Sequence, residues 1–256
     1  MIETATWPPS LTQEQADFLF MYFLDDDTED APWMVMGDLQ FWSASGFAHS
    51  LRTYAHERGL PWFVASMLPI QFDWPELAHK KVLSPDTFVA FVPEHARTSF
   101  DVEVEGQFPP FVLEVVSPSS TARDHEEKRR AYSLVAVQEY ALFTPRDDAP
   151  SSLEGYRRDG SGAFGRWTLD EQGRLWSVVL GLYLVVRGRL LQAQTPEGRL
   201  LLTPEQEAIA RLRAEDERQR ADAERRRSEE SLRRAEEEIE RLRRELERYQ
   251  DEGPRG

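Results

Sequence analysis

The sequence contains no cysteine in its 256 residues, which excludes a disulfide framework and a thiolate metal site. It also has no run of about 18 apolar residues, so no membrane-spanning helix is predicted. Residues 1–4 lack the basic segment that precedes the apolar stretch of a secretory signal. Together these absences predict a cytoplasmic protein.

Positive charge is scarce as well. Residues 1–204 carry 17 Lys and Arg against 29 Asp and Glu, a balance of −12. Broad electrostatic binding to nucleic acid relies on Lys and Arg, so such binding is not expected here. Any nucleic-acid contact must use local patches, and the candidates are Lys80, Lys81, Arg123 and Arg129. Ordinary solvated surface charge is the alternative explanation for each patch.

Hydrophobic residues make up 40% of the chain and include seven Trp, enough for the core of one domain of about 200 residues. Apolar patterning predicts helices at residues 11–24, 39–58 and 123–135. It predicts strands at residues 62–72, 82–92, 99–104, 111–116 and 140–145, and then a meander of short strands at 153–157, 166–169 and 182–186. A strand, a helix and a second strand in succession form a crossover unit. The expected fold class is therefore α/β (α+β), with a mixed β-sheet and flanking helices.

A second region begins at Thr203-Pro204, which is a typical helix start. No Gly or Pro occurs from residue 205 to 249, and Glu and Arg recur at spacings that suit ion pairs along a helix. Six residues follow a heptad pattern: Leu232, Ala235, Ile239, Leu242, Leu246 and Tyr249. The prediction is a domain at residues 1–202, a charged helix at 203–252 with a short coiled coil at 232–249, and a disordered end at 253–256. A homo-oligomer formed through this helix is expected, with a monomeric charged helix as the alternative.

Two acidic residues lie where apolar strands are predicted. Asp86 occurs in the sequence VLSPDTFV, and Glu114 occurs in FVLEVV. A buried carboxylate is costly unless something pairs with it. A divalent cation shared by both residues would serve, although each residue alone is also explained by a turn or by a solvent-facing strand position.

The helix that follows Glu114 adds a cation to this pair. Lys128 lies in the predicted helix after the Ser117-Pro118 break, and Asp124 lies four residues earlier on the same helical face. Mg²⁺ prefers carboxylate oxygens and keeps several waters, and Mn²⁺ is the alternative ion. A metal that polarises a phosphate, beside an ammonium that stabilises developing charge, could hydrolyse a phosphodiester.

The run FVLEVVSPSST, followed by Asp124, Lys128, Tyr132 and Glu139-Tyr140, resembles the Uma-type family of restriction endonucleases in the PD-(D/E)XK nuclease superfamily. Ser84-Pro85-Asp86 fits the first element of the family pattern. The resemblance covers about residues 60–250 and is most specific from 111 to 140.

This resemblance implies a restriction-endonuclease-like core that binds Mg²⁺ or Mn²⁺ and cleaves DNA. Asp86 and Glu114 would be metal ligands, Lys128 the catalytic lysine, and Asp124 a supporting residue. One departure concerns the helix at residues 39–58, because relatives carry a His near its start where this chain has Asp38, Leu39 or Gln40. Three functions stay open: a DNA endonuclease, a nuclease acting on RNA or a branched end, and an inactive nuclease-fold scaffold that assembles through its coiled coil.

Overall fold

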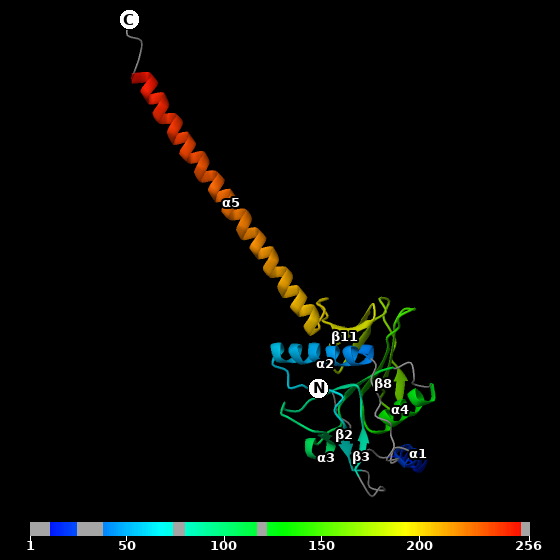
Figure 1. Ribbon diagram of the computed structural model, residues 1–256. Coiled ribbons are helices and arrows are strands. Elements are labelled where there is room, and N and C mark those ends of the chain that lie inside the picture. The colour runs from blue at the N-terminus through cyan, green and yellow to red at the C-terminus, as the bar shows by residue number, and fades with distance from the viewer. Residues whose placement is uncertain (1–10, 25–37, 74–79, 117–121, 252–256) are drawn as a thin grey trace. The chain divides into compact units, whose positions relative to one another are not determined.

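The computed structural model describes residues 11–24, 38–73, 80–116 and 122–251, with the side chains of residues 20, 22–24, 38, 122–124 and 249–251 left out (Figure 1). The chain divides into two compact units, Met1–Pro204 and Glu205–Gly256. The first unit is a mixed α/β domain and the second contains one long helix, so the predicted fold class is confirmed. The end at residues 253–256 lies outside the described residues.

The central sheet of the first unit has six strands in the order β1-β4-β6-β7-β8-β9. Its strands are β1 (Phe63–Ser66), β4 (Thr87–Ala90), β6 (Phe111–Val115), β7 (Glu139–Thr144), β8 (Ser152–Arg158) and β9 (Phe164–Arg166). Strands β6 and β7 are parallel, and the other neighbours are antiparallel. Helix α4 (Ala122–Leu134) connects the parallel pair, as the crossover predicted from the sequence requires.

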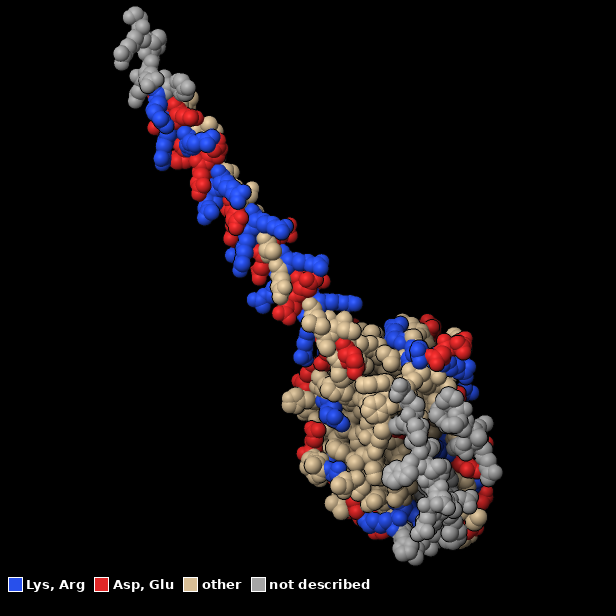
Figure 2. Space-filling view, viewed as in Figure 1, with Lys and Arg blue, Asp and Glu red and all other residues tan. Residues whose placement is uncertain are grey.

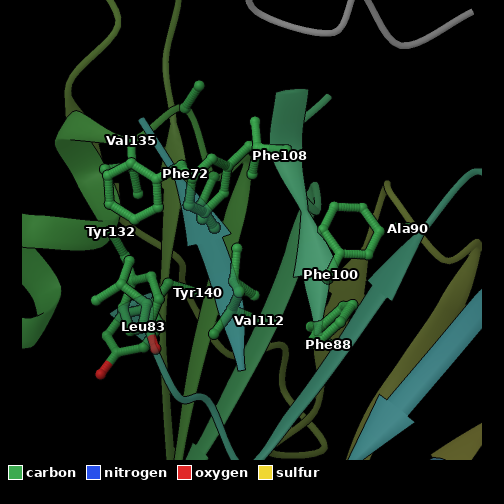
Figure 3. Close-up of a cluster of buried hydrophobic side chains, with 14 of the residues drawn as sticks. Phe72, Leu83, Phe88, Ala90, Phe100, Phe108, Val112, Tyr132, Val135 and Tyr140 are labelled. Atoms are coloured by element: carbon green, nitrogen blue, oxygen red, sulfur yellow. The ribbon is translucent and has the colours of Figure 1, made fainter. Parts of the chain in front are cut away.

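One face of the central sheet packs against α4, and α1 (Gln13–Leu24) contacts α4 in turn. This face also packs against a small sheet of β3 (Lys81–Leu83), β2 (Ile70–Phe72) and β5 (Phe100–Asp101). The even-numbered strand residues Phe88, Val112 and Tyr140 point into this core, where Tyr132 of α4 lies against Tyr140 (Figure 3).

The opposite face packs against α2 (Asp38–Arg58) and a third sheet of β10 (Leu175–Ser177), β11 (Leu182–Arg187) and β12 (Leu190–Gln194). Here the odd-numbered residues Val89, Phe111 and Leu113 belong to one hydrophobic core with Phe47 and Leu51 of α2. Because side chains alternate along a strand, Glu114 must point to the other face, toward α4.

Two predicted strands are wrong in their extent. Residues 62–72 are broken by Met67, which has a left-handed φ of 55°, so that β1 and β2 join different sheets. Residues 82–92 are likewise divided into β3 and β4 by Ser84-Pro85-Asp86. Asp86 therefore does not lie inside a strand but immediately before β4.

The predicted strand at residues 99–104 is also largely wrong, because only Phe100–Asp101 forms β5 and α3 (Val102–Glu105) follows. The Asp101 carboxylate caps this short helix by accepting from the Val104 amide at 3.3 Å, and Gly106 ends it with a φ of 72°. Strands β10 and β12 have no counterpart in the sequence prediction.

Helix α5 (Pro204–Asp251) forms the second unit. Its surface carries intermixed acidic and basic side chains along its length (Figure 2), and several are paired at i,i+4, such as Arg244 with Glu240 at 3.2 Å. Among the described parts of the chain, no helix combines the length and the apolar character needed to cross a membrane.

Candidate active site

Strand pairing brings Asp86 and Glu114 together. In the antiparallel pair β4–β6, Thr87 faces Leu113 and Phe88 faces Val112. Continuing this register by one residue places Asp86 opposite Glu114. Directly opposed residues of an antiparallel pair project to the same face, so the two carboxylates are neighbours.

The backbone of Asp86 is held by the break between β1 and β2. Its carbonyl oxygen accepts from the Ser66 hydroxyl at 2.9 Å and from the Met67 amide at 3.1 Å. The left-handed conformation of Met67 turns its N–H toward Asp86 while the chain leaves the sheet. The irregular segment therefore serves to fix the position of the acidic residue.

Asp86 is only 7% exposed, and two described residues donate hydrogen bonds to its carboxylate. Oδ2 accepts from the Val115 amide at 2.6 Å, and Oδ1 accepts from Gln40 Nε2 at 3.4 Å. Burial raises the pKa of Asp86 to about 7, and the nearby Glu114 carboxylate adds to the increase. The Val115 hydrogen bond and the Lys128 charge oppose that increase without cancelling it.

Glu114 is paired by two side chains of α4. Lys128 Nζ donates to Oε2 at 2.9 Å, and the Tyr132 hydroxyl donates to Oε1 at 2.8 Å. Lys128 and Tyr132 are four residues apart and so occupy one face of the helix. Glu, Lys, Arg and Ala dominate α4, which favours a helix, and Ala136 follows its end in a left-handed conformation with a φ of 68°.

The donor set of this site suits Mg²⁺ or Mn²⁺. Two adjacent carboxylates supply hard oxygen atoms, and the pKa of Asp86 is raised first by burial and then by the Glu114 charge, so a bound cation would stabilise its ionised form. Within the described residues, no group of three His, Cys, Asp or Glu side chains forms a closed cage. Mg²⁺ is commonly bound by one or two carboxylates together with water and substrate phosphate, so the pair fits this ion.

The structure gives less information about the other predicted site residues. Asp124 and Arg123 lie in the first turn of α4, but their side chains are outside the described residues. Lys80 is paired with Asp101 at 2.5 Å and with Glu103 at 3.6 Å, and Lys81 is buried. Arg129 lies over the Tyr156 ring at 4.9 Å. A role in binding nucleic acid stays a prediction for all four cations.

A third buried carboxylate, Glu139, is not part of this site. Parallel pairing aligns Glu139 with Phe111, whereas Glu114 is aligned with Leu142, three positions along the strand. Glu139 accepts from the Val178 amide and from Arg157 Nε, both at 2.9 Å, and from the Ser177 hydroxyl. It thereby links the central sheet to β10.

Three partners of the acidic pair were not assigned from the sequence: Gln40, the Val115 amide and the Tyr132 hydroxyl. Tyr132 could have been found, since its i+4 spacing from Lys128 predicts a shared face. Gln40 is 46 residues from Asp86, so sequence spacing gave no signal, although the family resemblance had marked residues 38–40 as the place where relatives carry a His.

Comparison with known proteins shows which family the chain belongs to. A solved structure described as a "putative nuclease belonging to DUF820" from Anabaena variabilis is similar to the chain. Its sequence identity is 13%, its TM-score is 0.40, and the match covers 59% of this chain and 73% of that one. No curated protein matches the sequence. The model of the Uma2 family, described as "Putative restriction endonuclease", matches residues 32–187. Since that match spans more than half of the chain, the protein belongs to the Uma2 family and has a nuclease-type fold.

Proposed function

We propose that the protein is an Mg²⁺-dependent endonuclease that hydrolyses DNA phosphodiester bonds in the cytoplasm. The observation that carries this proposal is the juxtaposition of Asp86 and Glu114 across β4 and β6, with Lys128 donating to Glu114 at 2.9 Å. Two carboxylates and an ammonium in contact are the groups that metal-assisted phosphodiester hydrolysis needs.

Each residue has a separate part in this mechanism. Asp86 and Glu114 would hold Mg²⁺, which when bound acts as a Lewis acid on the phosphate. Lys128 holds a positive charge beside them, where it can orient the attacking water or stabilise charge that develops on the phosphate. Tyr132 fixes the second oxygen of Glu114, so that the carboxylate keeps one orientation.

Replacing both carboxylates tests the metal site. Calorimetric titration of Mg²⁺ or Mn²⁺ into the wild type should show binding that is lost in Asp86→Ala/Glu114→Ala. Plasmid nicking by the same samples should fall by about a thousandfold or more, since groups that stabilise transition-state charge contribute ~3–4 kcal/mol each. Lys128→Met should retain metal binding while nicking falls by about a hundredfold.

The outcomes separate the open alternatives. No metal binding by the wild type would contradict the catalytic proposal and favour an inactive scaffold. Metal binding together with cleavage of RNA or branched DNA, but not of plasmid, would keep the site and change the substrate.

We also propose that α5 assembles the chain into a homo-oligomer through a short coiled coil. The heptad residues Leu232, Ile239, Leu242 and Leu246 are 51–62% exposed along one seam of an otherwise charged helix. A second copy of the helix would bury them, because apolar a and d positions are what a coiled coil packs.

A charge placed within this seam tests the assembly. Leu242→Glu should convert the oligomer to a monomer, whereas Ala223→Glu adds the same charge outside the seam and should leave the oligomer intact. Sedimentation velocity over a concentration series measures both. A monomeric wild type at all concentrations, or equal behaviour of the two variants, would refute the coiled coil.

A further inference from the structure

A basic pocket lies on a different face of α4 from the acidic site. Helices α1 and α4 and the β8–β9 hairpin enclose about 350 Å³, lined by Arg129, Arg130, Arg166, Tyr156, Phe164 and Glu126 among others. These elements lie side by side in the first unit (Figure 1). Among the described residues, three guanidinium groups and the Glu126 carboxylate line the pocket, although residues 1–204 as a whole carry a balance of −12.

The guanidinium groups of this pocket are accessible and weakly paired. Arg129, Arg130 and Arg166 have side chains that are 36%, 42% and 77% exposed. Their carboxylate partners Glu126, Glu14 and Glu154 lie at 3.5, 3.6 and 3.7 Å respectively. Exposed ion pairs of this length stabilise a protein little, so a phosphate can compete for the arginines.

Aromatic rings form the second component of the pocket. Tyr156 and Phe164 both stack on Tyr140, the latter with an interplanar angle of 3°, and the Arg129 guanidinium lies 4.9 Å from the Tyr156 ring centre. Arg158 holds the hairpin to α4 by donating to the Ser133 carbonyl oxygen, and to the segment after the helix by donating to that of Val137. Aromatic faces beside a positively charged groove are the combination that binds single-stranded nucleic acid.

Helix α4 connects this pocket to the acidic site. Glu126, Arg129, Arg130 and Ser133 follow the i, i+3, i+4, i+7 pattern of one helical face, and Lys128 and Tyr132 occupy another. Tyr132, whose hydroxyl donates to Glu114, also packs its ring against Tyr140 at a tilt of 34°, and Tyr140 in turn supports Tyr156 and Phe164. One helix and one aromatic layer therefore position both the acidic residues and the basic pocket.

We infer that this pocket binds a nucleotide of a single-stranded segment, with its phosphate at the arginines and its base against the aromatic wall. The inference rests on the proposed nuclease function, because the bound nucleotide would belong to the strand that Asp86 and Glu114 would cut. A volume of about 350 Å³ lies at the lower end of the range for small-ligand sites and suits one nucleotide unit.

Binding can be measured without cleavage, by fluorescence anisotropy of a labelled single-stranded oligonucleotide of about twelve nucleotides with EDTA present. Arg166→Gln should weaken binding by about threefold and lower the salt dependence by about 0.7 in the log–log slope, which is the loss of one phosphate contact. Glu126→Gln should strengthen binding by a similar factor, since it removes a carboxylate that lines the pocket beside Arg129. Arg189→Gln, on the turn between β11 and β12 where Arg189 pairs with Asp147, makes the same charge change elsewhere and should have no effect.

Weaker oligonucleotide binding by Arg166→Gln together with stronger binding by Glu126→Gln would support the pocket as the binding site. A merely structural role of these residues would explain only losses of affinity. Equal binding by Arg166→Gln and Arg189→Gln, or tighter binding of the matching duplex than of the single strand, would overturn the inference. Failure of the nuclease proposal is distinguishable, since the plasmid assay would then show no cleavage while the anisotropy shifts persist. DNA and RNA versions of the oligonucleotide identify the sugar that the pocket accepts.

Discussion

Asp86→Asn should abolish cleavage and at the same time make the metal-free protein more stable above neutral pH. The carboxylate is buried beside Glu114, and the pKa of Asp86 is raised to about 7, first by burial and then by that neighbouring charge. The Asn amide carries no charge, so it avoids both the cost of burying a charge and the repulsion from Glu114. Its oxygen can accept from the Val115 amide and its NH₂ can donate to Glu114, while the Gln40 amide can rotate to present its oxygen.

The direction of the pH effect follows from proton binding. Asp86 has a pKa of 3.8 in the unfolded chain and about 7 in the folded protein. Between these values the folded protein holds a proton that the unfolded chain has released, so folding stability falls as the pH rises from about 4 to about 7. The shift of about 3 pKa units corresponds to about 4 kcal/mol above neutral pH, and most of that loss should be absent from the variant.

Urea unfolding of both proteins measures this difference. All seven Trp lie in residues 1–204, so their fluorescence reports on the first unit alone. The advantage of Asp86→Asn should grow by about 3 kcal/mol between about pH 5 and about pH 8. Adding Mg²⁺ at the higher pH should stabilise the wild type by about 2.7 kcal/mol at a hundredfold excess over its Kd, and the variant much less. A difference in stability between the two proteins that stays constant from about pH 5 to about pH 8 would show that Asp86 ionises freely.

The residues of the acidic site were predictable where local patterning decides the structure. A buried Val, Leu and Phe run around Glu114, followed by a helix-forming segment and a second apolar run, predicts β6, α4 and β7. The i+4 spacing of Lys128 and Tyr132 then predicts that both reach the same neighbour. These inferences depend only on strand and helix periodicity.

The structure around Asp86 was less predictable because it depends on contacts far along the chain. Met67 breaks an apolar run that predicts one continuous strand. Its left-handed backbone is stabilised by a hydrogen bond from its N–H to the carbonyl oxygen of Asp86, 19 residues later. Gln40 approaches from the first turn of α2, and no sequence spacing reports that approach. Asp101 similarly redirects the chain into α3 through a cap that competes with strand formation.

Arg157→Met should destabilise the first unit by about 3 kcal/mol, because it leaves a buried charge without its cation. Glu139 is 1% exposed, burial raises its pKa, and Arg157 Nε donates to it at 2.9 Å. Arg157 is itself about a third exposed, which places the cost at the lower end of the range for broken buried pairs. The same guanidinium lies 4.7 Å from the Trp167 ring and donates to the Trp176 carbonyl, so some packing is also lost.

A second substitution distinguishes the cost of the unpaired charge from the cost of the lost packing. Glu139→Gln in the Arg157→Met background keeps an oxygen that accepts from the Val178 amide, and its NH₂ can donate to the Ser177 hydroxyl oxygen, while the unpaired charge is removed. The double variant should therefore regain much of the lost stability above neutral pH, where Glu139 would otherwise have to ionise without a partner. Urea unfolding followed by Trp fluorescence gives the comparison. If Glu139→Gln restored nothing, the cost of Arg157→Met would lie in its contacts with β10 and Trp167, and the carboxylate would not be what links the sheets.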